Sequence, residues 1–138
     1  MICLDTNAAI ALLSGGESPV RVRFRNAVAR GETLAASSIV LFELWFGAEK
    51  SARRENNAKK IAEFPSAGIR VLDFNASDAE EAGNVRAILR RTGTPIGPYD
   101  VLIAAQARRR GALLVTANVR EFARVPGLRI EDWTRPEA

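Results

Sequence analysis

The chain has 138 residues, of which 47% are hydrophobic and 26% are charged. This length fits one domain, residues 1–138, whose apolar core needs no disulfide or structural metal. No apolar run approaches the roughly 20 residues that cross a bilayer, and Asp5 interrupts the first run too early for a secretory signal. The lone Cys3 is expected to be a small buried hydrophobe. We therefore predict a cytoplasmic protein without membrane contact.

The chain contains no histidine. This excludes His general bases, Ser/His/Asp and Cys/His catalytic sites, and His-containing zinc or iron sites. A single cysteine excludes thiolate metal sites as well. If the protein is an enzyme, we expect carboxylates to carry its chemistry, with a hard cation such as Mg²⁺ or Mn²⁺ that prefers oxygen ligands.

The net charge is +4, and all but three of the 20 basic residues are Arg. Guanidinium groups match phosphate geometry, so this composition suits a phosphate-rich partner. A GC-rich genome, which favours Arg and Ala codons, explains the composition equally well.

Short apolar runs alternate with longer amphipathic ones, which is typical of α/β domains built around a mainly parallel sheet. In chain order, the predicted elements are strand 1–4, helix 7–13, helix 18–31, strand 33–37, helix 38–51, helix 54–64, strand 69–74, helix 77–91, helix 98–110, strand 112–118, helix 120–124 and strand 128–132. Ser18 is expected to cap helix 18–31, whose apolar stripe would include Val28, and residues 77–80 (SDAE) are expected to form the capping box of helix 77–91.

Asp5 ends the first predicted strand. In open parallel sheets, ligands bind outside the carboxyl ends of the strands. Thr116 and Asn118 end strand 112–118 at the same edge, so Asp5 is a candidate site residue. The alternative is that Asp5 caps the helix that follows, a role that Asn7 would suit as well.

Glu43 interrupts the apolar run IVLFELWF. On a helix it shares a face with Ile39, Phe46 and Gly47, so it need not point to solvent. A half-buried carboxylate costs several kcal/mol unless it meets a cation, a metal or hydrogen-bond donors. The alternative is that Glu43 forms the polar edge of an amphipathic helix.

Asp100 lies in the first turn of helix 98–110, above the buried stripe that begins at Ile103, where the helix dipole favours the ionised carboxylate. A first-turn Asp is also common for stability alone. Three carboxylates on three elements, each beside core-facing residues, would repel one another at one edge of a sheet unless cations bind. The pattern therefore predicts a metal site.

Four stretches in this order form a specific pattern: LDTNAAI, SSIVLFELWFGAEKS, PIGPYDVLIAAQA and LVTANVREFARVPGLRIEDW. With them the chain resembles the PIN-domain ribonucleases, and in particular the VapC toxins of bacterial toxin–antitoxin pairs, over nearly its whole length. The resemblance implies one PIN-like domain, an α/β/α sandwich with a mainly parallel sheet. It also implies Mg²⁺- or Mn²⁺-dependent cleavage of RNA, with tRNA among the usual targets.

The resemblance makes Asp5 and Asp100 the principal metal ligands and Glu43 the third acid of the site. Many relatives carry a fourth acid where this chain has Asn118, and Glu121 is the alternative for that position. The number of metal ions stays open. In such a site the metal acidifies a bound water, which Glu43 or a fourth carboxylate orients for in-line attack that leaves 5′-phosphate and 3′-hydroxyl ends.

The partners implied are RNA, a second copy of the chain in a homodimer, and a cognate antitoxin that plugs the site and alone contacts DNA. Trp45 and Phe46 suit a protein interface, or else ordinary core. Arg side chains flanking the acids are expected to hold RNA, although a solvated basic face or a helix C-terminus explains them too. The candidates are Arg86, Arg90, Arg91, Arg108, Arg109 and Arg110.

Two other functions compete with the nuclease. An Asp-nucleophile phosphatase would need a second Asp at the position of Asn7. A non-catalytic partner in an operator-binding toxin–antitoxin complex would not need Asp5, Glu43 and Asp100 to be intact.

Overall fold

The centre of the protein is a five-stranded sheet with the order β3-β2-β1-β4-β5, in which every neighbouring pair of strands is parallel. The structure is a computed structural model, and it describes residues 1–137. The strands are β1 (Ile2–Leu4), β2 (Leu34–Ser37), β3 (Ile69–Leu72), β4 (Leu113–Val115) and β5 (Arg129–Glu131).

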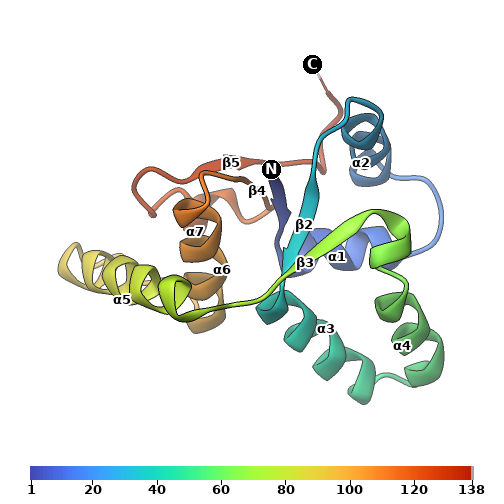
Figure 1. The fold of residues 1–138 in the computed structure, drawn as a ribbon, viewed down its shortest axis with the longest axis horizontal. Coiled ribbons are helices and arrows are strands. Elements are labelled where there is room, and N and C mark those ends of the chain that lie inside the picture. Colours follow the sequence, from blue (N-terminus) through green and yellow to red (C-terminus); the bar gives the residue numbers. More distant parts are fainter. Residues whose placement is uncertain (138) are drawn as a thin grey trace.

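Helices cover both faces of this sheet. They are α1 (Thr6–Leu13), α2 (Pro19–Ala29), α3 (Ser38–Lys50), α4 (Arg54–Ala62), the short 3-10 helix Pro65–Ala67, α5 (Ala76–Arg91), α6 (Pro98–Arg109) and α7 (Val119–Phe122). In Figure 1, α1, α2 and α4 lie to the right of the sheet, α5, α6 and α7 to the left, and α3 extends below its lower edge. The predicted α/β/α sandwich is confirmed. Within residues 1–137, none of the helices combines the length and the apolar composition that a membrane span needs.

The order of the strands reverses at β1. The chain proceeds from β1 to β2 and β3 on one side, and it returns to place β4 and then β5 on the other. In open α/β sheets, such a switch point opens a crevice between the loops that leave the two central strands. The carboxyl ends of β1 and β4, followed by Asp5 and Thr116, form that point here.

The core lies on both sides of the central strands. All residues of β1 and β2 are buried, as expected for parallel strands with helices on both faces. Cys3 belongs to this core, and burial raises the pKa of its thiol to about 11. The prediction that Cys3 is a buried hydrophobe is confirmed.

The helix caps agree in part with the sequence pattern. The Ser18 hydroxyl accepts a hydrogen bond from the Arg21 N–H and caps α2 as expected, but Val28 is 45% exposed and lies off the apolar face. The predicted capping box at residues 77–80 is wrong. The box is formed by Asn75 and Asp78, and α5 begins at Ala76.

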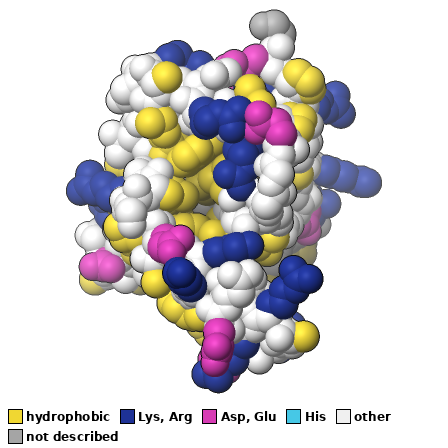
Figure 2. Space-filling view, turned by 90° about the vertical axis from the view of Figure 1, so that its right-hand side faces the viewer, with side chains coloured by type: hydrophobic (Ala, Val, Ile, Leu, Met, Phe, Trp, Pro, Cys, Tyr) yellow, Lys and Arg dark blue, Asp and Glu magenta, His cyan; other side chains and the backbone are white. Residues whose placement is uncertain are grey.

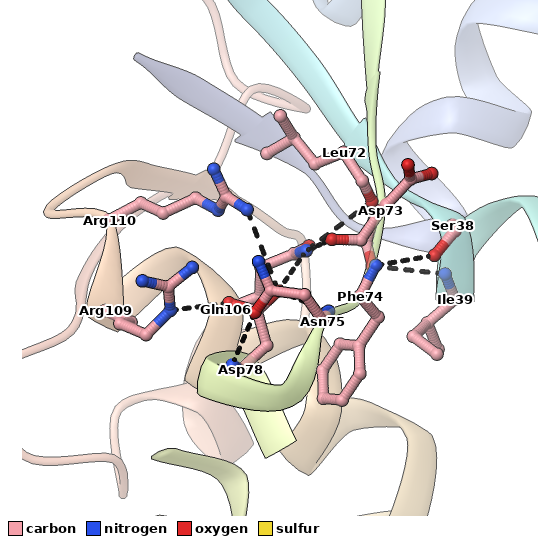
Figure 3. Close-up of polar contacts among 11 residues, drawn as sticks. Ser38, Ile39, Leu72, Asp73, Phe74, Asn75, Asp78, Gln106, Arg109 and Arg110 are labelled. Atoms are coloured by element: carbon pink, nitrogen blue, oxygen red, sulfur yellow. Dashed lines mark hydrogen bonds and ion pairs between the residues drawn. The ribbon is translucent and has the colours of Figure 1, made fainter. Parts of the chain in front are cut away.

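The capping box lies there because the Asp78 carboxylate is held by the rest of the fold (Figure 3). Asp78 is fully buried, and it accepts hydrogen bonds from Arg109 Nε at 2.7 Å and Gln106 Nε2 at 3.0 Å, while an Arg110 nitrogen lies 3.7 Å away. We call these four residues the Asp78 cluster. Burial by itself raises the pKa of Asp78, but hydrogen bonds from the Asn75 N–H, Arg109 and Gln106 hold it below its usual value.

The Asp78 cluster fastens the C-terminal end of α6. Gln106 Nε2 also donates to the carbonyl oxygen of Asp73 at 3.2 Å, so α6 is tied both to α5 and to the end of β3. Arg109 and Arg110 are thus engaged at the opposite end of α6 from Asp100. The prediction that they flank the acids is wrong, because the buried charge of Asp78 holds them.

Candidate active site

Asp5 stands where β1 passes into α1. Its N–H donates to the Val115 carbonyl of β4 at 3.1 Å, and its carboxylate Oδ1 accepts a hydrogen bond from the Ala8 N–H at 2.8 Å. The N-cap role that the sequence left open is therefore observed. The side chain is nonetheless only 4% exposed and lies at the switch point of the sheet, which is unusual for a residue that serves only as a cap.

The Asp5 carboxylate lies in a buried position that disfavours its charged form. Burial raises its pKa above the usual value, although hydrogen bonds from the Thr116 hydroxyl and the Ala8 N–H act in the opposite direction. The charge of Glu43 raises the pKa further. Asp5 and Glu43 are 38 positions apart in the sequence, and the fold brings their charges together.

Asp100 joins them from the first turn of α6, which begins after Gly97. The pKa of Asp100 is raised to about 6. Burial is the largest cause, and the charges of Glu43, Glu121 and Asp5 contribute the rest. A Cβ at position 97 would lie 3.1 Å from Asp100 Oδ2, so the missing side chain of Gly97 gives this carboxylate its room. We call Asp5, Glu43, Asp100 and Glu121 the acid cluster.

Glu43 is positioned by a residue whose part the sequence did not reveal. Thr6 Oγ1 donates a hydrogen bond to Glu43 Oε1 at 2.6 Å, from the first residue of α1 to the middle of α3. Glu43 is half-buried, so the prediction that it need not point to solvent is confirmed. The only feature of the sequence that could have predicted this hydrogen bond is the position of Thr6 directly after Asp5.

Asn118 and Glu121, the two alternatives for the fourth position, lie side by side. The Asn118 side-chain amide donates to Glu121 Oε2, and the Asn118 N–H donates to Thr116 Oγ1 at 2.9 Å. The Thr116 hydroxyl also lowers the pKa of Asp5, so the polar residues that follow β4 lie beside the end of β1. The charge of Glu121 raises the pKa of Asp100, so Glu121 is the member of this pair that acts on the other acids.

The acid cluster has no cationic partner. Within residues 1–137, none of its four carboxylates forms an ion pair with Lys or Arg. No three acidic side chains in this range converge closely enough to enclose a metal ion by themselves. The donor set still fits Mg²⁺ or Mn²⁺, because these ions prefer oxygen and commonly take only one or two carboxylates while keeping several waters.

Comparisons with known proteins agree with this fold. Residues 2–128 match the PIN domain family. The chain belongs to the PIN-domain family. It is 45% identical to the tRNA(fMet)-specific endonuclease VapC of Salmonella typhimurium over 94% of this chain and 96% of that protein. It is 47% identical to the protein of the same name from Shigella flexneri, over 95% of this chain and 96% of that one.

A solved structure gives the same result. The fold is similar to a chain in the crystal structure of DNA-bound VapBC from Salmonella typhimurium, with a TM-score of 0.86, 45% identity, and coverage of 96% of this chain and 97% of that chain. The resemblance to VapC proteins drawn from the four sequence stretches is confirmed.

Proposed function

We propose that this PIN-domain protein is the toxin of a bacterial toxin–antitoxin pair, a Mg²⁺- or Mn²⁺-dependent endoribonuclease. The observation that carries the proposal is the acid cluster, in which burial and the charges of neighbouring carboxylates raise the pKa of Asp5 and of Asp100, while no Lys or Arg within residues 1–137 forms an ion pair with them. Such mutual repulsion is relieved when a divalent cation binds. The ribonuclease and endonuclease names of the curated relatives support cleavage of RNA.

The residues have distinct parts in the proposed reaction. Asp5 and Asp100 would hold the metal, which when bound supplies an acidic water and neutralises charge that develops on the phosphate. With no histidine in the chain, Glu43 is the group that orients a water and accepts its proton. Thr6 holds Glu43, and Glu121 with Asn118 completes the fourth side of the site.

We propose tRNA as the substrate class, because the Salmonella and Shigella relatives are named for tRNA(fMet). An antitoxin partner is proposed from the likeness to VapBC complexes, two of which are bound to DNA. We propose that this chain contacts DNA only through that antitoxin. Cytoplasmic localisation stays a prediction.

The outer side of α3 supports a protein interface. Phe42, Trp45 and Phe46 are 52%, 40% and 58% exposed, so the alternative that Trp45 and Phe46 belong to the core is wrong. Phe42 packs against exposed Tyr99, with ring centroids 5.4 Å apart. Exposed aromatic groups of this kind are typical of protein interfaces, and they support the proposed homodimer.

The test is expression of the wild type and Asp5→Asn in a bacterium, with sequencing of RNA ends. Asn is chosen because it can still cap α1, which keeps the variant folded while it removes the charged ligand. We expect the wild type to arrest growth and to create Mg²⁺-dependent 5′-phosphate ends in tRNA, and Asp5→Asn to do neither. Equal growth arrest by both proteins would favour the non-catalytic rival.

A further inference from the structure

A groove leads away from the acid cluster along α3. It has a volume of about 520 Å³ and is bounded by the end of α1 on one side and by α4 on the other. Glu43, Gly47 and Ser51 line it at intervals of four residues, so they follow one face of α3. Eight residues of helix separate Glu43 from Ser51, which places the far end of the groove about 12 Å from the acids.

The far end of this groove is cationic. Arg53 and Lys60 line it, and within residues 1–137 neither forms an ion pair. Their neighbour Arg54, by contrast, is paired with Glu49 at 3.0 Å. Figure 2 shows Lys and Arg side chains around the lower part of the face where α4 lies. The groove therefore has a negative end at Glu43, where we propose a metal, and a positive end at Arg53 and Lys60, which form no ion pair within residues 1–137.

The corner between α3 and α4 is built to keep this end in place. Ser51 Oγ accepts hydrogen bonds from the Arg53 N–H at 3.0 Å and from the Asn57 side-chain amide at 3.1 Å. Asn57 also lines the groove, so its carboxamide is aimed there by Ser51. Gly47 leaves the middle of the groove open, since nothing lies within 4 Å of the position a Cβ would take.

We infer that this groove binds the RNA backbone beside the scissile bond, with Arg53 and Lys60 holding phosphates and Asn57 a sugar or phosphate oxygen. The inference rests on the proposed function. The acid cluster repels a polyanion wherever no metal neutralises it, so the attraction that holds the strand must come from outside it. A strand whose reacting phosphate lies at Glu43 and which follows α3 meets Arg53 and Lys60 next. These cations determine how tightly RNA binds, and the acids determine how fast it is cut.

The experiment compares two double variants that remove the same charge. Arg53→Gln with Lys60→Gln empties the groove of cations, and Arg54→Gln with Lys59→Gln removes two charges beside it from residues that do not line it. Binding of purified bulk tRNA and of an unstructured RNA oligonucleotide is measured in EDTA, where no cleavage occurs, over a range of salt concentrations. Cleavage with Mg²⁺ is then measured to separate KM from kcat.

We expect the groove variant to bind RNA at least tenfold more weakly and the matched control less than threefold more weakly. The salt dependence of log K for the single-stranded probe should flatten by about 1.4 in the groove variant, about 0.7 for each phosphate that the protein no longer neutralises. KM should rise as affinity falls, while kcat changes less than twofold.

Equal losses in the two double variants would overturn the inference, because they would show an effect of net charge alone. Unchanged RNA affinity in the groove variant would overturn it too. The binding arm needs no catalysis, so a wild type that binds RNA but cuts none would refute the proposed function and leave this inference standing.

Discussion

An aspartate lies at each end of α6, and the surroundings shift the pKa values of the two in opposite directions. Beside the C-terminal end, Asp78 is fully buried, yet hydrogen bonds from the Asn75 N–H, the Arg109 guanidinium and the Gln106 carboxamide keep its pKa below the usual value. At the N-terminal end, Asp100 is more exposed than Asp78, yet its partial burial and the charges of Glu43, Glu121 and Asp5 raise its pKa to about 6. Burial alone does not distinguish the two. The presence or absence of a compensating cation does, and it separates a structural carboxylate from a candidate metal ligand.

The largest effect is expected from Asp100→Asn. Removal of this proposed metal ligand should lower kcat/KM about 10³-fold. The free energy of unfolding should not decrease, because the substitution relieves repulsion from Glu43 and Asp5. RNA cleavage and urea unfolding measure the two effects, with the exposed Asp73→Asn as the control. A loss of activity below tenfold would show that Asp100 is not essential to the site.

Asp78→Asn should lower stability and leave the catalytic activity of the folded protein unchanged, which is the reverse of Asp100→Asn. Arg109 and Arg110 would lose their carboxylate, and because their side chains are only 31% and 25% exposed, we expect a loss of about 3 kcal/mol in the free energy of unfolding. Below the unfolding transition, cleavage should persist. The exposed Glu80→Gln on the same helix should change stability by less than about 0.5 kcal/mol. A change below about 1 kcal/mol for Asp78→Asn would mean that the ion pairs contribute little.

The two carboxylates should also respond to pH in opposite directions. The pKa of Asp100 is raised in the folded protein, so its protonation favours folding as pH falls from about 6 toward 4. The same protonation should weaken Mg²⁺ binding by about fivefold between pH 6 and pH 5. The pKa of Asp78 is lowered, so its stabilisation is present above pH 4 and is lost as pH falls through the folded value.

Calorimetric Mg²⁺ titrations and urea unfolding at several pH values measure both responses. Asp100→Asn should remove the gain in stability between pH 6 and 4, and Asp78→Asn should remove the loss at lower pH. Identical pH profiles for the two variants would refute the contrast between the two ends of α6.

The smallest effect is expected from Gly97→Ala. The new Cβ would lie 3.1 Å from Asp100 Oδ2, so the carboxylate must shift by a few tenths of an ångström. We expect kcat to fall about fivefold, since catalysis is sensitive to small displacements of reacting groups. Gly83→Ala on α5, where nothing lies within 4 Å of the new Cβ, is the matched control and should leave cleavage unchanged. An unchanged kcat in Gly97→Ala would show that Asp100 tolerates the displacement.

Much of this molecule follows from local patterns. The alternation of apolar runs places the five strands and seven α-helices of residues 1–137, and Asp5, Glu43 and Asp100 each stand out because a charge interrupts or borders an apolar stretch. The capping box of α5 is misplaced by the sequence pattern because SDAE is a good local match. The chain uses Asn75 and Asp78 instead, since Arg109, which is 31 residues distant, holds the Asp78 carboxylate.

The sequence by itself determined the kind of chemistry. Without histidine and with a single cysteine, the composition favours carboxylates with a hard cation, and the order of the four family stretches identifies the PIN domain. Only the tertiary structure decided which charges are paired. The basic run at the end of α6 is held by Asp78, while Arg53 and Lys60, which no local pattern marked, line the groove beside Glu43. The physical reason is that electrostatic energy depends on distance in space and on burial, and neither quantity is contained in spacing along the chain.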